Sequence, residues 1–288
     1  MNHRYVFFGT PHIAHLSLEA LEQKGMLPAL IITAPARLQG RGMHLVETPV
    51  AAFAREHDIP CLTPEKITAE VIELLNDADS WDFFFVVAYG KILPQSLLDI
   101  VHGKVLNLHP SLLPKYRGPS PLESVLLSDE TETGVTIMKL DKHVDHGPIV
   151  AQQTFDLPIE MTADQLTEKS ATIGIELFSE FIDQYLSGEL VPVEQHHDAS
   201  THTRKYSKAD GLLTDDMSDE QKWKIFRALG DRGWVHFTTV RHNEPLTVKI
   251  TKGSYNDSYA DGGSFVIEEV IPENGKRQFY EDFLHSLH

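Results

Sequence analysis

The sequence has almost no cysteine and no long apolar run. Cys61 is the single cysteine among 288 residues, so no disulfide can form within the chain. The longest apolar run, residues 83–89, is far shorter than the roughly 20 residues that a helix needs to cross a bilayer, and the first residues lack the pattern of a signal peptide. We therefore expect a cytoplasmic protein with no membrane partner.

Basic residues are also scarce, since the net charge is −17. A nucleic-acid partner usually requires clustered Lys and Arg. The imbalance lies in residues 1–200, which hold 13 basic and 28 acidic residues, whereas residues 201–288 hold 12 and 14. A basic face is thus possible in the second part, and an ordinary mixed-charge surface is the alternative. The candidates for that face are Arg204, Lys205, Lys208, Lys222, Lys224 and Arg227.

Short apolar segments alternate with helical patterns in the first 110 residues. The composition predicts strands at residues 5–8, 29–33, 82–88 and 105–109. Apolar spacing predicts helices at residues 49–57 and 69–76. Strands separated by helices indicate a parallel α/β sheet, and the unbroken apolar run at residues 83–88 is typical of a central strand that is covered on both faces.

Two capping boxes mark the starts of later helices. Thr162 with Gln165 predicts a helix that continues to about residue 186, and Ser218 with Gln221 predicts a second helix ending near residue 229. Three β-rich segments follow, at residues 234–240, 246–250 and 265–271. We expect a large domain at 1–189, a linker at 190–205 and a small β domain at 206–288.

A polar pair marks the end of one predicted strand. The strand period of two places Asn107 and His109 on the same face, just before Pro110. Ligands of open parallel sheets bind at the carboxyl ends of the strands, so an amide and an imidazole there can form a catalytic pair. Taken alone, Asn and His beside a proline are more often turn residues.

Other kinds of site find little support. The segment after the first strand, Gly9-Thr10-Pro11, is not a glycine-rich dinucleotide fingerprint, which argues against a nicotinamide cofactor. The histidines near residue 197 match no common zinc spacing, so we expect no metal.

The chain beyond His109 carries a recognisable combination of motifs. Ser-Leu-Leu-Pro occupies residues 111–114, Arg-Gly follows at 117–118, and Asp145-His146-Gly147 comes later. This combination resembles the formyltransferases that use 10-formyltetrahydrofolate. The resemblance implies a Rossmann-like catalytic domain, an OB-like second domain, no metal, and catalytic roles for three residues: Asn107, His109 and Asp145. The second domain appears shortened by a couple of strands relative to that family, which puts tRNA binding by this domain in doubt.

Within that family, the segment Pro35–Gly42 resembles the loop with which some members reach the acceptor end of tRNA. The implied acceptor is methionyl-initiator tRNA. The implied acceptor contacts are Gly40, Arg41, Gly42 and Arg117, although Arg117 could instead pair with an acid. Met43 and His44 stand where the family usually has basic residues.

The resemblance implies that the folate lies along two segments, where side chains and main-chain groups meet its ring. The residues concerned are Ala88, Tyr89, Gly90, Ile92, Ser111, Leu112, Leu113 and Pro114. Asn107 is suited to stabilising the oxyanion and His109 to proton transfer, while Asp145 either orients the imidazole or organises a water. The alternatives are an N-formyltransferase for a nucleotide-linked amino sugar, a folate hydrolase, and a non-catalytic tRNA-binding relative. We expect a monomer, with a dimer through an exposed sheet edge as the alternative.

Overall fold

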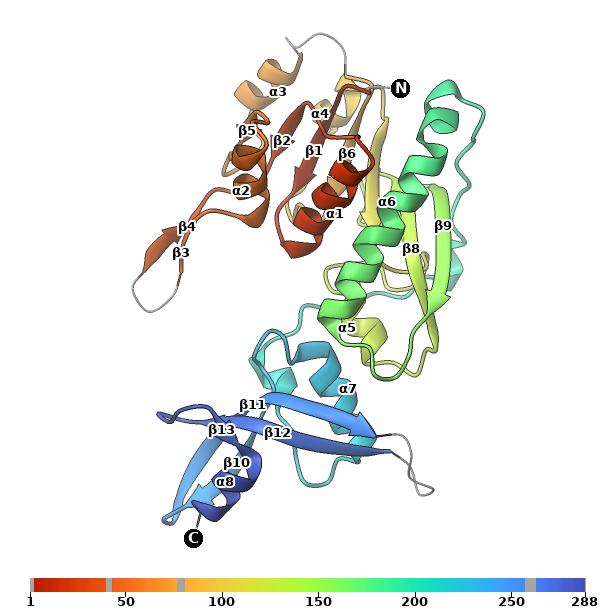
Figure 1. Ribbon diagram of the computed structural model, residues 1–288. Coiled ribbons are helices and arrows are strands. Elements are labelled where there is room, and N and C mark those ends of the chain that lie inside the picture. The colour runs from red at the N-terminus through yellow and green to blue at the C-terminus, as the bar shows by residue number, and fades with distance from the viewer. Residues whose placement is uncertain (1–2, 40–42, 77–80, 257–262, 288) are drawn as a thin grey trace. The chain divides into compact units, whose positions relative to one another are not determined.

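The computed structural model describes residues 3–39, 43–76, 81–256 and 263–287 (Figure 1). The chain divides into two compact units. The first contains residues 1–119, 133–155 and 167–202, and the second contains residues 120–132, 156–166 and 203–288. The second unit thus takes two short segments from within the first 189 residues in addition to the C-terminal part of the chain.

A seven-stranded sheet, in the order β5-β2-β1-β6-β7-β8-β9, forms the centre of the first unit. Its strands are β1 (Tyr5–Gly9), β2 (Leu30–Ile32), β5 (Cys61–Leu62), β6 (Phe83–Val87), β7 (Val105–His109), β8 (Glu132–Lys139) and β9 (Ile149–Asp156). The strands from β5 to β7 are parallel, and β8 runs antiparallel to β7. The predicted parallel sheet is confirmed, and an antiparallel strand extends it.

Helices and one hairpin complete the first unit (Figure 1). The helices are α1 (His12–Gln23), α2 (Pro49–Glu56), α3 (Ala69–Asn76), α4 (Gln95–Ile100), most of α6 (Ala163–Ser187) and the short η1 (His197–Ala199). The hairpin consists of β3 (Arg37–Gln39) and β4 (His44–Val46). The predicted capping box at Thr162 is present, since the Thr162 N–H donates to Oε1 of Gln165 at 3.0 Å.

The central strands bury both of their faces. On one face, Phe84 and Val86 lie in a cluster with Leu75 of α3 and with Leu97 and Leu98 of α4. On the other face, the rings of Phe83 and Phe85 lie 5.8 and 4.4 Å from that of Phe178 in α6. The apolar run therefore forms a central strand, as its composition predicts.

The register of β7 decides which of its side chains face each layer. Asn107 pairs in register with Val86, so Asn107 and His109 share the α3–α4 face. Leu108 points to the opposite face, where a Cβ atom on Gly174 of α6 would lie 2.3 Å from Leu108 Cδ1. The helix can approach β7 this closely because residue 174 has no side chain.

The second unit contains a four-stranded antiparallel sheet in the order β10-β11-β12-β13. Its elements are α5 (Pro121–Leu126), η2 (Lys208–Gly211), α7 (Asp219–Leu229), β10 (His236–Arg241), β11 (Glu244–Asn256), β12 (Ser264–Pro272), β13 (Gln278–Phe279) and α8 (Tyr280–His285). The predicted small β domain is confirmed. Helix α7 begins at the predicted capping box of Ser218 and Gln221.

The predicted basic face on α7 is wrong for two of its members. Arg227 is 3% exposed and donates from Nε to the carbonyl of Leu126 at 3.0 Å and from Nη1 to that of Ile159 at 3.0 Å. Lys224 is engaged in ion pairs with Asp129 and Glu220 at 2.5 and 2.7 Å. These cations hold the second unit together and do not form a free basic surface.

Among the described residues, no helix is both long enough and apolar enough to cross a bilayer.

We predict that Gly174→Ala destabilises the protein, although the same change usually stabilises a helix by about 1 kcal/mol. The added methyl group would overlap Leu108, which is 2% exposed and has little room to move. The expected loss is about 1–3 kcal/mol in the free energy of unfolding, measured in urea. Thr172→Ala, at an exposed position of α6, is the control. A Gly174→Ala protein as stable as the wild type would contradict the packing described for β7.

Candidate active site

Strand β7 brings Asn107 and His109 to the carboxyl end of the parallel strands. Both side chains are buried, with Asn107 9% and His109 4% exposed. The His109 Nε2 atom lies 2.9 Å from the carbonyl oxygen of Tyr116. Because a carbonyl only accepts, this contact assigns a proton to Nε2 and leaves Nδ1 on the side of Asp145, 3.6 Å from its Oδ1 atom.

Asp145 reaches His109 from the turn between β8 and β9. Its backbone has φ +48°, in the left-handed region, and its Oδ2 atom accepts a hydrogen bond from the Gly118 N–H at 2.7 Å. Two residues further on, a Cβ atom on Gly147 would lie 2.0 Å from the Lys139 carbonyl oxygen. The Asp-x-Gly spacing therefore has a physical reason, since the turn passes too close to β8 for any larger residue at 147.

The segment 111–114 is fixed by two side chains from the adjacent strands. The buried Thr136 hydroxyl donates to the Ser111 carbonyl at 2.6 Å and accepts from the Leu113 N–H at 3.2 Å. Gln152 donates from Nε2 to the Leu113 carbonyl at 3.0 Å. Three main-chain polar groups of this predicted folate segment are thus bonded within the protein. The segment can therefore contact a ligand mainly through its shape and its apolar surface.

Neither Thr136 nor Gln152 was singled out from the sequence. Thr136 stands opposite His109 in the pairing of β7 with β8. This position could not be inferred without knowing that β8 is the next strand in the sheet.

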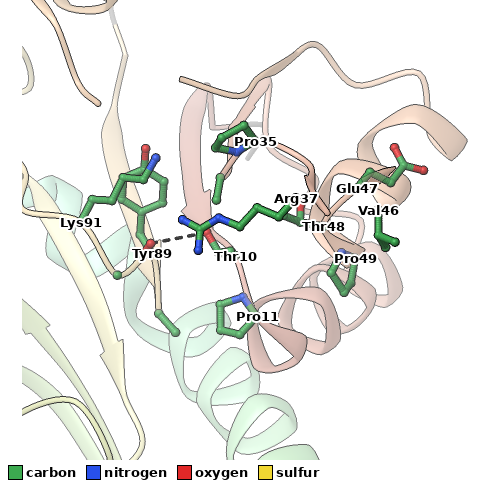
Figure 2. Close-up of a pocket in the computed structure, with 13 residues that line it drawn as sticks. Thr10, Pro11, Pro35, Arg37, Val46, Glu47, Thr48, Pro49, Tyr89 and Lys91 are labelled. Carbon is green, nitrogen blue, oxygen red and sulfur yellow. Dashed lines mark hydrogen bonds between the residues drawn. The ribbon is translucent and has the colours of Figure 1, made fainter. Parts of the chain in front are cut away.

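A cavity of about 530 Å³ opens at the same edge of the sheet, beyond the ends of β1, β2 and β6 (Figure 2). Three predicted folate residues, Ala88, Tyr89 and Gly90, are part of its wall, whereas Ile92 is 92% exposed and does not line it. Ala88 and Gly90 have φ values of +47° and +74°, in the left-handed region, and the backbone bends here. Thr10 holds this turn by donating from Oγ1 to the Tyr89 carbonyl at 3.4 Å.

Two cations and one acid line the cavity. Arg37 comes from β3, Lys91 follows the Ala88 turn, and Glu47 lies between β4 and α2 (Figure 2). Burial lowers the pKa of the Lys91 ammonium, and the nearby Arg37 charge acts in the same direction, while Glu65 opposes both. Lys91 also donates to the Pro64 carbonyl at 2.7 Å. The cavity wall thus combines apolar surface with positive charge.

The hairpin β3–β4 leads away from this cavity. The predicted acceptor contacts Gly40, Arg41 and Gly42 lie outside the described residues. Within the hairpin, Leu38 of β3 and Leu45 of β4 are 56% and 71% exposed. The hairpin therefore presents apolar side chains outward in addition to Arg37.

Arg117 lies behind the site and is only 4% exposed. Its Nη2 atom donates to Oε1 of Gln195 at 2.6 Å and lies 2.9 Å from Nδ1 of His197. Among the described residues, Arg117 thus bonds to an amide and an imidazole and not to an acid. A contact between Arg117 and the acceptor stays a prediction. Gln195 carries no recognisable signal in the sequence, because its surroundings have the composition of a linker.

His146 is stacked on His197, with ring centroids 4.0 Å apart. The Nδ1 atom of His146 lies 2.7 Å from Asp141. The described residues contain no cluster of three or more His, Cys, Asp or Glu side chains that could hold a metal.

The chain belongs to a known family. Residues 3–182 match the family model Formyl transferase. The methionyl-tRNA formyltransferase of Halorhodospira halophila is 35% identical over 98% of this chain and 96% of its own length. That of Geobacter sulfurreducens is 39% identical over 73% of this chain and 66% of its own length. The predicted family is confirmed.

A solved structure supports the fold. The N-formyltransferase from Helicobacter canadensis, in complex with folinic acid and dTDP-3-aminofucose, superposes with a TM-score of 0.68 at 19% identity. The superposition covers 93% of this chain and 99% of that one. At this identity the likeness shows the fold alone, a formyltransferase domain followed by further chain.

We predict that Thr136→Val loosens the segment 111–114. Valine has nearly the shape of threonine but leaves the Ser111 carbonyl and the Leu113 N–H without the Thr136 hydroxyl. The expected loss is about 1–3 kcal/mol in the free energy of unfolding. Thr154→Val, at an exposed position of β9, is the matched control and should change stability by less than about 0.5 kcal/mol. Equal effects of the two substitutions would show that Thr136 does not organise the loop.

Proposed function

We propose that this formyltransferase moves a formyl group from 10-formyltetrahydrofolate to the amino group of methionyl-initiator tRNA. The observation that carries the chemistry is the approach of His109 to Asp145, with Asn107 two residues earlier on the same strand face. The acceptor is supported by the Halorhodospira halophila relative, which bears this activity in its name and aligns with nearly the whole chain.

The reaction needs three things from the protein. The amine attacks the formyl carbon, a negative charge develops on the formyl oxygen, and the N10 atom of the folate leaves with a proton. An amide N–H of Asn107 suits the oxygen charge, and the His109 imidazole suits the proton transfers. Asp145 suits either of two tasks, the orientation of the imidazole or the organisation of a water molecule.

The donor site combines the Ala88–Gly90 turn with the segment 111–114. Both follow the carboxyl ends of parallel strands, where ligands of such sheets bind. The Helicobacter canadensis enzyme of the same fold was solved with folinic acid, a formylated folate, which supports a folate donor. Ile92, which is almost fully exposed, is the weakest member of the predicted set.

The acceptor site includes the cavity with Arg37 and Lys91 and the hairpin that leads from it. Positive charge beside an apolar wall suits an aminoacyl ester next to a phosphate. Gly40, Arg41 and Gly42 belong to the same proposal through the motif that they form in the sequence. We also propose that the enzyme acts as a monomer in the cytoplasm.

The proposed chemistry predicts large losses from single substitutions. His109→Ala should reduce kcat by about 10²–10⁴ through loss of proton transfer, and Asn107→Ala by about 10²–10³ through loss of the oxyanion donor. The measurement is the transfer of radiolabelled formyl from 10-formyltetrahydrofolate to charged initiator tRNA. His285→Ala, an exposed histidine on α8, is the matched control and should keep wild-type activity.

A competing acceptor distinguishes the proposed function from the alternative functions. A nucleotide-linked amino sugar is added to the same assay with and without tRNA. Label on the sugar alone would keep the donor and catalytic assignments and overturn the acceptor. No label on either acceptor, with a wild-type chain that is folded, would support a folate hydrolase or a binding protein.

Arg37→Ala should weaken tRNA binding more than the chemistry. The KM for methionyl-tRNA should rise about 5–10-fold, which corresponds to one lost phosphate contact, with the KM for the folate nearly unchanged. The dependence of log KM on log salt should become shallower by about 0.7–0.9. Arg241→Ala, an exposed arginine of the second unit, is the control. An unchanged salt dependence would remove Arg37 from the acceptor site.

A further inference from the structure

Gln195 lies directly behind the catalytic turn and is 5% exposed. Its Nε2 atom donates to the carbonyl oxygens of Asp145 and Gly147 at 3.0 and 2.8 Å. Its Oε1 atom accepts from Nη2 and Nε of Arg117 at 2.6 and 3.2 Å. The side-chain amide therefore donates through its NH₂ group to the Asp145 turn and accepts through its oxygen from Arg117.

The orientation of this amide follows from its neighbours. A guanidinium only donates and a carbonyl only accepts, so the amide oxygen must face Arg117 and the NH₂ group must face the turn. If the amide were rotated by 180°, its NH₂ group would face the donors of Arg117 and its oxygen would face the carbonyl oxygens of Asp145 and Gly147.

The surrounding backbone brings Gln195 to this place. Ile149 at the start of β9 exchanges two hydrogen bonds of 2.8 Å with Val193, two residues before Gln195. On the far side, the Thr201 carbonyl accepts from the Arg117 N–H at 2.9 Å. The segment 193–202 is thus joined both to the start of β9 and to the loop that follows β7.

The Asp145 turn depends on such support. A left-handed backbone is less favourable than an extended or helical one, although Asp tolerates it better than most residues, so contacts that hold the turn help to define its geometry. Gly118 holds the carboxylate through one hydrogen bond, and Gln195 holds the main chain through two. Together these contacts fix where Oδ1 of Asp145 lies relative to His109.

We propose that Gln195 is a positioning residue for formyl transfer, which it serves by tying the Asp145 turn to the buried Arg117. The expected effect on the kinetics rests on the proposed function. The hydrogen bonds between Gln195 and the Asp145 turn do not depend on that function. Arg117, in this arrangement, acts as the fixed point against which Gln195 is held.

Two substitutions separate the two ends of the link. Gln195→Glu keeps an acceptor for Arg117 but cannot donate to the turn, and Gln195→Leu removes both contacts. Both should lower kcat by about 10–100-fold, since a displacement of about 1 Å at a catalytic group has effects of this size, while both KM values stay within threefold. Gln184→Glu, at an exposed position of α6, is the matched control with wild-type kinetics.

A double-mutant cycle distinguishes positioning from general destabilisation. If Gln195 acts through Asp145, Gln195→Glu should cause little further loss of kcat in an Asp145→Asn protein. Equal losses in the two backgrounds would overturn the proposal. Wild-type kcat in Gln195→Glu would overturn it as well.

Hydrogen exchange tests the link between Gln195 and the Asp145 turn without measuring activity. Peptides covering residues 141–148 should exchange faster in Gln195→Glu than in the wild type, with exchange in α6 unchanged. Unchanged exchange at residues 141–148 would overturn the link whatever the kinetics. If the wild type formylates no acceptor, the proposed function fails, and this arm still decides whether Gln195 holds the turn.

Discussion

The orientation of β7 is the constraint on which the site depends. Leu106 and Leu108 point toward α6, whereas Asn107 and His109 point to the other face. A slip of one residue would exchange the two sets, because successive side chains of a strand alternate between faces. The register is held by parallel pairing with β6 on one side and antiparallel pairing with β8 on the other. The chemistry thus rests on a packing arrangement to which the polar residues themselves contribute little.

The sequence predicts the elements whose signals are local. β7 and α3 have the predicted bounds, and α7 begins at the predicted capping box, because apolar period and capping chemistry act within a few residues. Helix α1 went unpredicted. It begins after Pro11 without any side-chain cap, so its start carries no polar signal. The residues of the hairpin β3–β4 likewise predict only a loop.

Contacts between distant segments could not be predicted in this way. Arg227 looked like part of an exposed basic face, but its partners Leu126 and Ile159 are supplied by segments that precede it by 101 and 68 positions. Gln195 stood in what composition marks as a linker, and its partner Asp145 is 50 positions away. The proposed catalytic residues can be predicted only because their motifs resemble a family, since Asn107 and His109 alone also fit a simple turn.

The geometry of the site is therefore determined by three segments, which are the end of β7, the loop that follows it and the turn between β8 and β9, and not by Asn107, His109 and Asp145 alone. Tyr116 and Gly118, in the loop after β7, contact His109 and Asp145 through main-chain atoms, and such contacts carry no side-chain signal in the sequence. Asp adopts the left-handed backbone found at residue 145 more readily than most residues, and the neighbouring hydrogen bonds hold it there. A carboxylate held in this way can keep its distance from the imidazole while ligands enter and leave. Gly118 and Gln195, which support the Asp145 turn, thereby influence how Asp145 is placed relative to His109.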